Sequence, residues 1–141
     1  MVLVKYGFTG TRNGLRNSQK NSIIHQLQNE INIGNDIEVH HGDCIGADND
    51  FHDICANLIL KNPNSKIKIV IHPPTDNKLR AYCKSNSVCK EKTYLERNKD
   101  IVDNTEILIG CPYDNEEKLR SGTWSTIRYA KKNNKTVLLF F

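Results

Sequence analysis

The apolar residues of this chain gather in short, nearly continuous runs separated by longer stretches of mixed polarity. Such runs, bounded by glycine, proline or asparagine, are typical of buried strands. The predicted strands cover residues 2–8, 37–41, 67–71, 106–111 and 136–141. Between the runs, apolar residues recur three and four positions apart, which is the period of an amphipathic helix. The predicted helices cover residues 18–33, 47–60, 94–102 and 122–132.

Local signals predict where the first two helices begin or end. Asn17 or Ser18 suits the N-cap of the first helix, and Gly34 suits its end because glycine readily adopts a left-handed conformation. The segment Asn62-Pro63-Asn64 ends the second helix. Residues 75–92 follow two prolines, are polar and have no clear period, so we expect a mobile loop there.

The order of these elements predicts the fold class. Strands that alternate with helices and are apolar on both faces indicate a parallel sheet covered on both sides. We therefore expect an α/β fold, with residues 1–141 forming one three-layer domain around a mainly parallel five-stranded sheet. Ligands in such folds bind outside the carboxyl ends of the strands, and the glycine-rich segments of this chain follow those ends.

Composition narrows the choice of partners. The chain has 141 residues, of which 38% are hydrophobic, and a net charge of +4. That charge suits an anionic ligand, but it is too small to indicate a nucleic-acid partner. No apolar run approaches the roughly 20 residues of a membrane helix, and the N-terminus reads as a strand rather than a secretory leader. We expect a cytoplasmic protein without a membrane partner.

Cysteine and histidine residues are the candidate metal ligands. The chain has five cysteines, an odd number without CxxC spacing, which predicts reduced thiols. His40, His41, Asp43 and Cys44 are ligand types, but adjacent residues of a strand point to opposite faces and do not easily converge on one ion. We therefore expect neither a metal nor a cofactor.

Two glycine-rich segments near the N-terminus are candidate binding loops. In the first, Gly10 permits close backbone approach, Thr9 and Thr11 supply hydroxyls, and Arg12 offers a fork for phosphate. The second consists of Gly42, Asp43, Gly46, Ala47 and Asp48. Asp48 either accepts hydrogen bonds from ribose hydroxyls or caps the following helix, and Gly46 provides backbone shape.

The third candidate loop begins the last predicted helix. Ser121, Gly122 and Thr123 place small residues with free backbone N–H groups at a helix N-terminus, which is suited to a phosphate. Trp124 either stacks on a base or packs in the core. Arg97, in the preceding helix, either contacts the ligand or forms a solvated pair.

Four segments in this order resemble the SLOG superfamily of Rossmann-like nucleotide-binding proteins, and in particular its YpsA-related branch. The segments are residues 7–12, 41–48, 94–98 and 121–126. The resemblance implies a nucleotide-derived ligand, such as an ADP-ribose-like or cyclic signalling nucleotide in antiviral conflict, and a possible homo-oligomer. Arg97 resembles the arginine of the Glu-Arg-Lys motif of the Lonely Guy phosphoribohydrolases, although Asn98 replaces the motif's lysine.

The clearest departure from those enzymes is at Thr126, where their motif carries a glutamate that acts on the N-glycosidic bond. A threonine is a poor base and carries no charge. We therefore expect a binding protein, a sensor or a sequestering protein, rather than a hydrolase. The alternative is a nucleoside 5′-monophosphate N-glycosidase in which another carboxylate, such as Glu116 or Glu117, takes that part.

Overall fold

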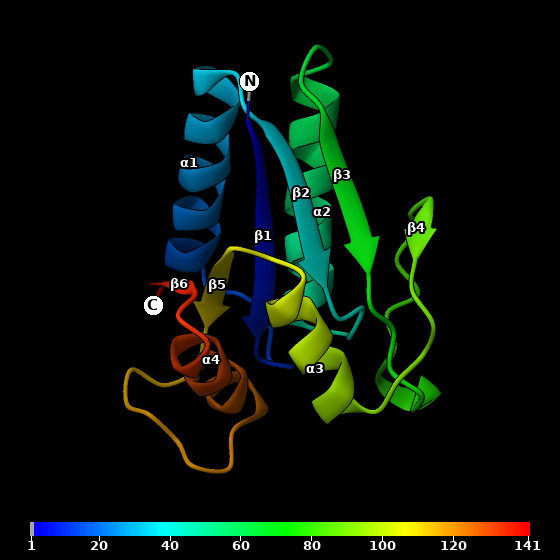
Figure 1. The fold of residues 1–141 in the computed structure, drawn as a ribbon, viewed down its shortest axis with the longest axis vertical. Helices are drawn as coiled ribbons and strands as arrows, with labels where there is room; N and C mark the ends of the chain where they lie inside the picture. Colours follow the sequence, from blue (N-terminus) through cyan, green and yellow to red (C-terminus); the bar gives the residue numbers. More distant parts are fainter. Residues whose placement is uncertain (1) are drawn as a thin grey trace.

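Six parallel strands form one sheet in the order β4-β3-β2-β1-β5-β6 (Figure 1). The computed structural model describes residues 2–141. The strands are β1 (Leu3–Gly10), β2 (Asp36–His41), β3 (Ile67–Ile71), β4 (Ser87–Val88), β5 (Ile107–Cys111) and β6 (Thr136–Leu139). The helices are α1 (Asn17–Ile33), α2 (Ala47–Lys61), α3 (Tyr94–Asp103), α4 (Gly122–Lys132) and a short 3₁₀ helix (Asn77–Leu79). The predicted α/β class and parallel sheet are confirmed.

The strand order places the topological switch point at β1. The chain extends the sheet on one side of β1 through β2 and β3, and on the other side through β5 and β6. Helices α1 and α2 cover one face of the sheet, and α3 and α4 cover the other (Figure 1). The switch point thus lies beside the carboxyl end of β1, which is the usual ligand position in this architecture.

Aromatic packing from β1 holds the first helical layer. Tyr6 and Phe8 are almost completely buried beneath α1 and α2, and the Phe8 ring stacks on Phe51 with 4.3 Å between centroids. A smaller cluster on the opposite face joins α3 and α4, with Leu108 and Ile127 at its centre. The core thus anchors the helices on both faces of the sheet.

The sixth strand corrects the prediction of five. Strand β4 lies inside residues 75–92, which were expected to form a mobile loop, and pairs Ser87 with Val70. Two residues are too few to produce a sequence period, so only the partner strand reveals it. Asp43 also ties this segment down, because its carbonyl accepts a hydrogen bond from the Ala81 N–H at 2.7 Å.

The ends of α1 agree with the sequence in one case and differ in the other. Gly34 ends the helix at φ 93°, in the left-handed conformation that was expected. The N-cap is Arg16 rather than Asn17 or Ser18. Its backbone N–H donates to Gln19 Oε1 at 2.9 Å, which is the half of a capping box that the third helical residue supplies.

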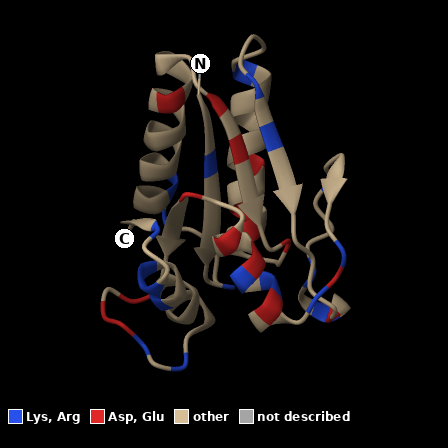
Figure 2. Cartoon of the chain, viewed as in Figure 1, with Lys and Arg blue, Asp and Glu red and all other residues tan. Residues whose placement is uncertain are grey.

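Charged residues of both signs lie along α3 and along the connection between β5 and α4 (Figure 2). Across residues 2–141, no helix combines the length and apolar character that a membrane span requires. All five cysteines are free thiols.

Buried histidines should make the fold sensitive to acid. Burial lowers the pKa of His41 to about 3 and that of His72 to about 4, from an ordinary value of 6.5. As the pH falls below 6.5, the unfolded chain binds protons at these positions before the folded chain does. We expect the free energy of unfolding to decrease from about pH 7 to about pH 4 in denaturant titrations.

A matched pair of variants tests this assignment. The His72→Gln variant should show a weaker pH dependence because it lacks one titrating group, whereas replacing the exposed His25 by glutamine should not change the slope. An unchanged slope in His72→Gln would contradict a contribution from this residue.

Candidate functional site

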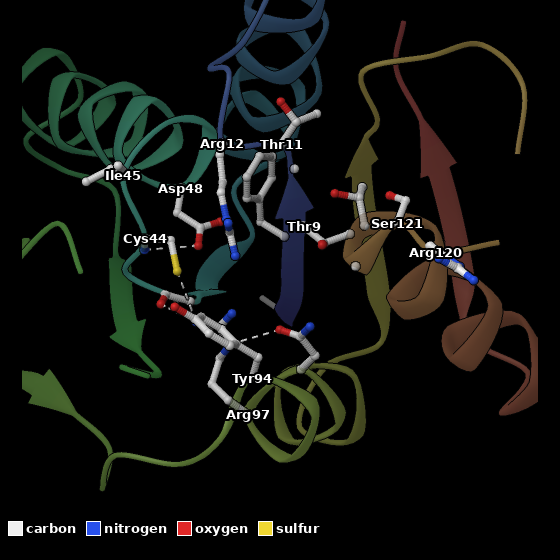
Figure 3. Close-up of a pocket in the computed structure, with 16 residues that line it drawn as sticks. Thr9, Thr11, Arg12, Cys44, Ile45, Asp48, Tyr94, Arg97, Arg120 and Ser121 are labelled. Carbon is white, nitrogen blue, oxygen red and sulfur yellow. Dashed lines mark hydrogen bonds between the residues drawn. The ribbon is translucent and has the colours of Figure 1, made fainter. Parts of the chain in front are cut away.

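A cavity of about 480 Å³ opens where the carboxyl ends of β1 and β2 meet the N-termini of α2, α3 and α4 (Figure 3). This volume lies in the usual range for small-molecule sites. The cavity is lined by Phe8, Thr9, Gly10, Thr11, Arg12, Gly42, Cys44, Ile45, Asp48, Tyr94, Arg97, Asn98, Arg120, Ser121, Gly122 and Thr123.

Residues from every candidate segment of the sequence meet at this cavity. Those that were proposed as ligand contacts and line it are Thr9, Gly10, Thr11, Arg12, Gly42, Asp48, Arg97, Ser121, Gly122 and Thr123. The remaining proposed contacts, Asp43, Gly46, Ala47 and Trp124, lie outside the cavity lining. Each of these has another physical role.

Asp43 points away from the cavity into the segment that precedes β4. It is completely buried, and its carboxylate accepts hydrogen bonds from Arg80 Nε at 2.9 Å and from the Cys83 N–H at 2.8 Å. These contacts satisfy both carboxylate oxygens. Asp43 therefore holds the 75–92 segment against the end of β2 instead of facing a ligand.

Gly46 and Ala47 join the first two loops together. The Ala47 N–H donates to the Thr11 carbonyl at 2.9 Å. Gly46 has φ 90°, and a Cβ atom there would collide with the backbone of Arg12. Gly46 was expected to set the backbone conformation of this loop. The structure gives the reason, because only a glycine lets the loop at Arg12 lie directly against α2.

Trp124 belongs to the core. It is 5% exposed and packs with Val102, Leu108 and Ile127 between α3 and α4. Of the two alternatives left open by the sequence, packing is therefore the one this geometry favours. Its indole Nε1 is buried and has no hydrogen-bond partner within residues 2–141.

Arg97 is a buried cation in the wall of the cavity. Its side chain is anchored by the Gly42 carbonyl, which accepts from Nη1, and by Asn98 Oδ1, which accepts from Nε at 2.8 Å. The guanidinium also lies 5.3 Å from the ring centroid of Tyr94. Within residues 2–141, its Nη2 group makes no hydrogen bond, so a donor of this fork remains free for a ligand.

Gly42 is needed because Arg97 and Asp48 both approach its α-carbon. A Cβ atom at this position would overlap the Arg97 guanidinium and would lie 2.9 Å from Asp48 Oδ2. The glycine thus lets a buried cation and a buried carboxylate approach the same backbone position. Any larger residue would push one of them out of the cavity wall.

Asp48 provides the carboxylate of the cavity. Its Oδ2 accepts the Cys44 N–H at 3.2 Å, and the Gly42 backbone also donates to this side chain. Asp48 was also considered as a cap of α2. Its carboxylate instead accepts a hydrogen bond from the loop before α2. Burial raises the pKa of Asp48 to about 6, although Arg97 opposes the rise.

Tyr94 contributes an aromatic surface that the sequence reasoning missed. The guanidinium carbons of Arg12 and Arg97 lie 5.9 Å and 5.3 Å from the centroid of its ring, within the range of cation–π contacts. A signal for it was present: positions 94, 97 and 98 follow the i, i+3, i+4 spacing that places residues on one helix face. The other lining residues that were missed are Phe8, Cys44, Ile45, Asn98 and Arg120.

The N-terminus of α4 forms the opposite wall (Figure 3). Ser121 is its N-cap, with Oγ accepting the Trp124 N–H at 3.2 Å, and Arg120 precedes it. Thr126 lies one turn further along, donates to the Gly122 carbonyl at 2.9 Å and faces a shallow depression between α3 and α4. The residue at position 126 therefore lies outside the chemistry of this cavity.

The buried His41 and His52 and the partly buried Cys83 form a separate cluster whose possible ligand atoms lie within 4.8 Å of one another. The Asp43 N–H donates to His41 Nδ1 at 3.0 Å, so neutral His41 carries its proton on Nε2. That proton is directed at His52 Nδ1, 2.9 Å away. The two nitrogens that a metal would need are therefore occupied by the hydrogen bond between His41 and His52. This favours a structural role for the two histidines over an ion site.

No protein-family model matches this chain, and no curated protein matches it. A solved structure titled "X-ray structure of TM1055 Northeast Structural Genomics Consortium target VT76" is similar to it, with 18% sequence identity and a TM-score of 0.56. The match covers 97% of this chain and 72% of that chain. At this identity the likeness concerns the fold alone, and the chain has a Rossmann-like parallel α/β fold.

The contact between Gly46 and Arg12 gives a prediction about stability. We expect Gly46→Ala to lower the free energy of unfolding by more than about 1 kcal/mol, because the residue has a positive φ and the new methyl group meets backbone. Gly122→Ala is the matched control, since no atom lies within 4 Å of its Cβ position. Urea denaturation in which both variants behave alike would contradict this role for Gly46.

Proposed function

We propose that this protein binds a phosphorylated nucleoside or a nucleotide-derived signalling ligand in the cavity. The observation that carries the proposal is that a positively charged wall and a carboxylate face each other across one cavity. Arg120 and the N-terminus of α4 form one wall, and the Asp48 carboxylate lies in the facing wall (Figure 3). A phosphate ester of a polyol has the same division between an anionic group and hydrogen-bond donors.

The two helix N-termini differ in their suitability for an anion. The first turn of α2 already contains Asp48 and Asp50, whose negative charges oppose its positive end. In the first turn of α4, the backbone N–H groups of Gly122 and Thr123 have no hydrogen-bond partner among residues 2–141. This difference supports our proposal that the phosphate binds at α4, with the sugar hydroxyls directed toward Asp48.

The guanidinium groups of Arg12 and Arg97 lie 5.9 and 5.3 Å from the centroid of the Tyr94 ring, on the same side of the cavity as Asp48 (Figure 3). Both guanidinium groups are available to further anionic oxygens of a longer ligand, such as a diphosphate. Tyr94 offers a flat surface for a base. This arrangement accommodates ADP-ribose-like and cyclic nucleotides in the same way as a monophosphate, so the proposal covers that class.

We further propose that the chain is a distant SLOG protein that acts as a sensor or sequestering protein. What supports this is the meeting of residues from all the motif segments at one cavity, in a Rossmann-like fold. An N-glycosidase activity is the second candidate and rests on Asp48.

Ligand binding can be measured by thermal shift and calorimetry with AMP, ADP-ribose and cyclic AMP. We expect stabilisation that weakens as salt is raised, because the attraction between the arginines and phosphate is screened. Arg120→Gln should weaken Kd by about tenfold, the loss expected for one charge-assisted hydrogen bond. Binding of unphosphorylated adenosine should not depend on Arg120.

Lys131→Gln is the matched control, because Lys131 is an exposed cation at the other end of α4. It should bind like the wild-type protein. The proposed function would be contradicted by the absence of stabilisation with all phosphorylated probes at saturating concentration, or by equal losses in the two variants.

A further inference from the structure

We propose that Arg128 is a positioning residue for the phosphate end of the cavity. Arg128 belongs to α4 and does not line the cavity, so it acts on a ligand only through other residues. It holds the turn that carries Arg120 and Ser121, and in this way it sets the affinity for a phosphorylated ligand. This inference rests on the proposed function, because that function puts the phosphate at the N-terminus of α4.

The connection between β5 and α4 has little support between its two ends. It loops away from the body of the molecule (Figure 1), and residues 113–120 are all exposed, with Leu119 84% exposed. Among residues 2–141, every hydrogen bond that joins residues 114–120 to another element involves Arg128. One side chain therefore holds this part of the connection.

Arg128 contacts three consecutive residues of the connection. Its Nη1 donates to Glu117 Oε2 at 2.9 Å and to the Lys118 carbonyl at 3.4 Å, and its Nη2 donates to the Leu119 carbonyl at 3.0 Å. The ion pair with Glu117 is partly exposed on both sides and contributes little by itself. The contacts with two successive carbonyls matter more, because a planar guanidinium directs its N–H groups and so fixes the orientation of the backbone.

These contacts act directly on the residues that face the ligand. The Leu119 carbonyl belongs to the same peptide group as the Arg120 N–H, so its direction sets the plane from which Arg120 departs. The Ser121 N–H donates to the Lys118 carbonyl at 3.3 Å, which closes the turn and places the N-cap of α4. Arg120 and Ser121 both line the cavity. The contacts of Arg128 therefore determine where two of the lining residues lie.

Arg128 is a suitable support because the helix that carries it is firmly anchored. Trp124 and Ile127 of α4 are almost completely buried in the core. Side chains of a helix lean toward its N-terminus, so a long side chain from the second turn reaches back over the residues that precede the helix. The connection is thus tied to the same helix whose N-terminus it completes.

The same contact accounts for one of the carboxylates that the sequence offered for chemistry. Glu117 pairs with Arg128, and neither Glu116 nor Glu117 lines the cavity. Glu117 therefore takes part in holding the connection, and its carboxylate does not face the cavity.

Removing the Arg128 contacts should weaken the binding of phosphate. A site whose donors are already in place loses less conformational entropy when the ligand arrives, whereas without Arg128 the ligand itself would have to order the turn. We expect the Kd for AMP to rise about fivefold in Arg128→Gln, measured by isothermal titration calorimetry. The Kd for unphosphorylated adenosine should stay unchanged. Equal losses for AMP and adenosine would contradict a role at the phosphate end.

Two further variants separate positioning from charge. Arg128→Lys keeps the positive charge but lacks the fork that holds two carbonyls, so it should lose affinity for AMP as Arg128→Gln does. Lys132→Gln is the matched control, because it removes another exposed positive charge from α4, and it should bind AMP like the wild-type protein. Wild-type affinity in Arg128→Lys would show that only the charge matters and would overturn the proposal.

A double variant shows whether Arg128 acts through the turn. In the Arg120→Gln background, Arg128→Gln should raise the Kd for AMP by no more than about twofold, because the side chain that it positions is already absent. Losses that multiply fully in the double variant would mean that the two arginines act independently, against the proposal.

Proteolysis measures the order of the turn without a ligand. Trypsin cleaves after lysine and arginine, and the connection contains Lys118 and Arg120. We expect cleavage at these positions, identified by mass spectrometry, to be about fivefold faster in Arg128→Gln, in proportion to the open population of the turn. Equal cleavage rates would overturn the role of Arg128 as a support. If Arg128→Gln does not fold, Arg128→Lys takes its place in each measurement.

The outcomes distinguish this inference from the proposed function. Wild-type protein that binds AMP, together with an Arg128→Gln variant that binds it equally well, overturns the role of Arg128 and leaves the proposed function in place. Wild-type protein that binds no phosphorylated probe overturns both.

Discussion

The buried guanidinium of Arg97 is the interaction on which the cavity depends. A charged group in a protein interior is costly unless hydrogen bonds and opposite charge compensate it. Here the Gly42 carbonyl and Asn98 supply hydrogen bonds, and Asp48 supplies nearby negative charge. Because the side chain comes from α3 and its main partner from the end of β2, satisfying this charge requires the two layers to meet at one place. Gly42 makes the meeting possible by leaving its Cβ position empty.

The loops around Arg97 are held by backbone contacts rather than by side-chain pairs. The Thr11 carbonyl is bound by the Ala47 N–H, and Gly46 lies against the Arg12 backbone. Asp43 holds the next segment of the chain in place. Several residues of the glycine-rich motifs thus build the cavity without lining it. A rigid frame of this kind keeps the lining side chains in position before a ligand arrives.

The cavity combines two neighbouring sets of charges with different tasks. The α4 wall and its preceding arginine attract anionic oxygens, and the α2 wall carries a carboxylate whose pKa is raised by burial. The difference follows from the first turns of the two helices, because α2 contains acidic residues there and α4 does not. The same asymmetry supports the proposed binding orientation.

The sequence by itself determined the α/β class, the parallel sheet and the meeting of its glycine-rich segments at one edge. Strand runs and helical periods are local, and parallel strands necessarily bring their carboxyl ends together. Which residues of those segments line the cavity was decided only by the tertiary structure. Asp43 and Asp48 are both acidic residues of one loop, yet one satisfies Arg80 and Cys83 and the other faces the cavity. That choice depends on backbone direction and on contacts between residues far apart in the sequence. One example is the hydrogen bond from Arg97 to the Gly42 carbonyl, across a separation of 55 residues. The strand β4 was decided in the same way, since two residues form a strand only when a neighbour supplies the hydrogen bonds.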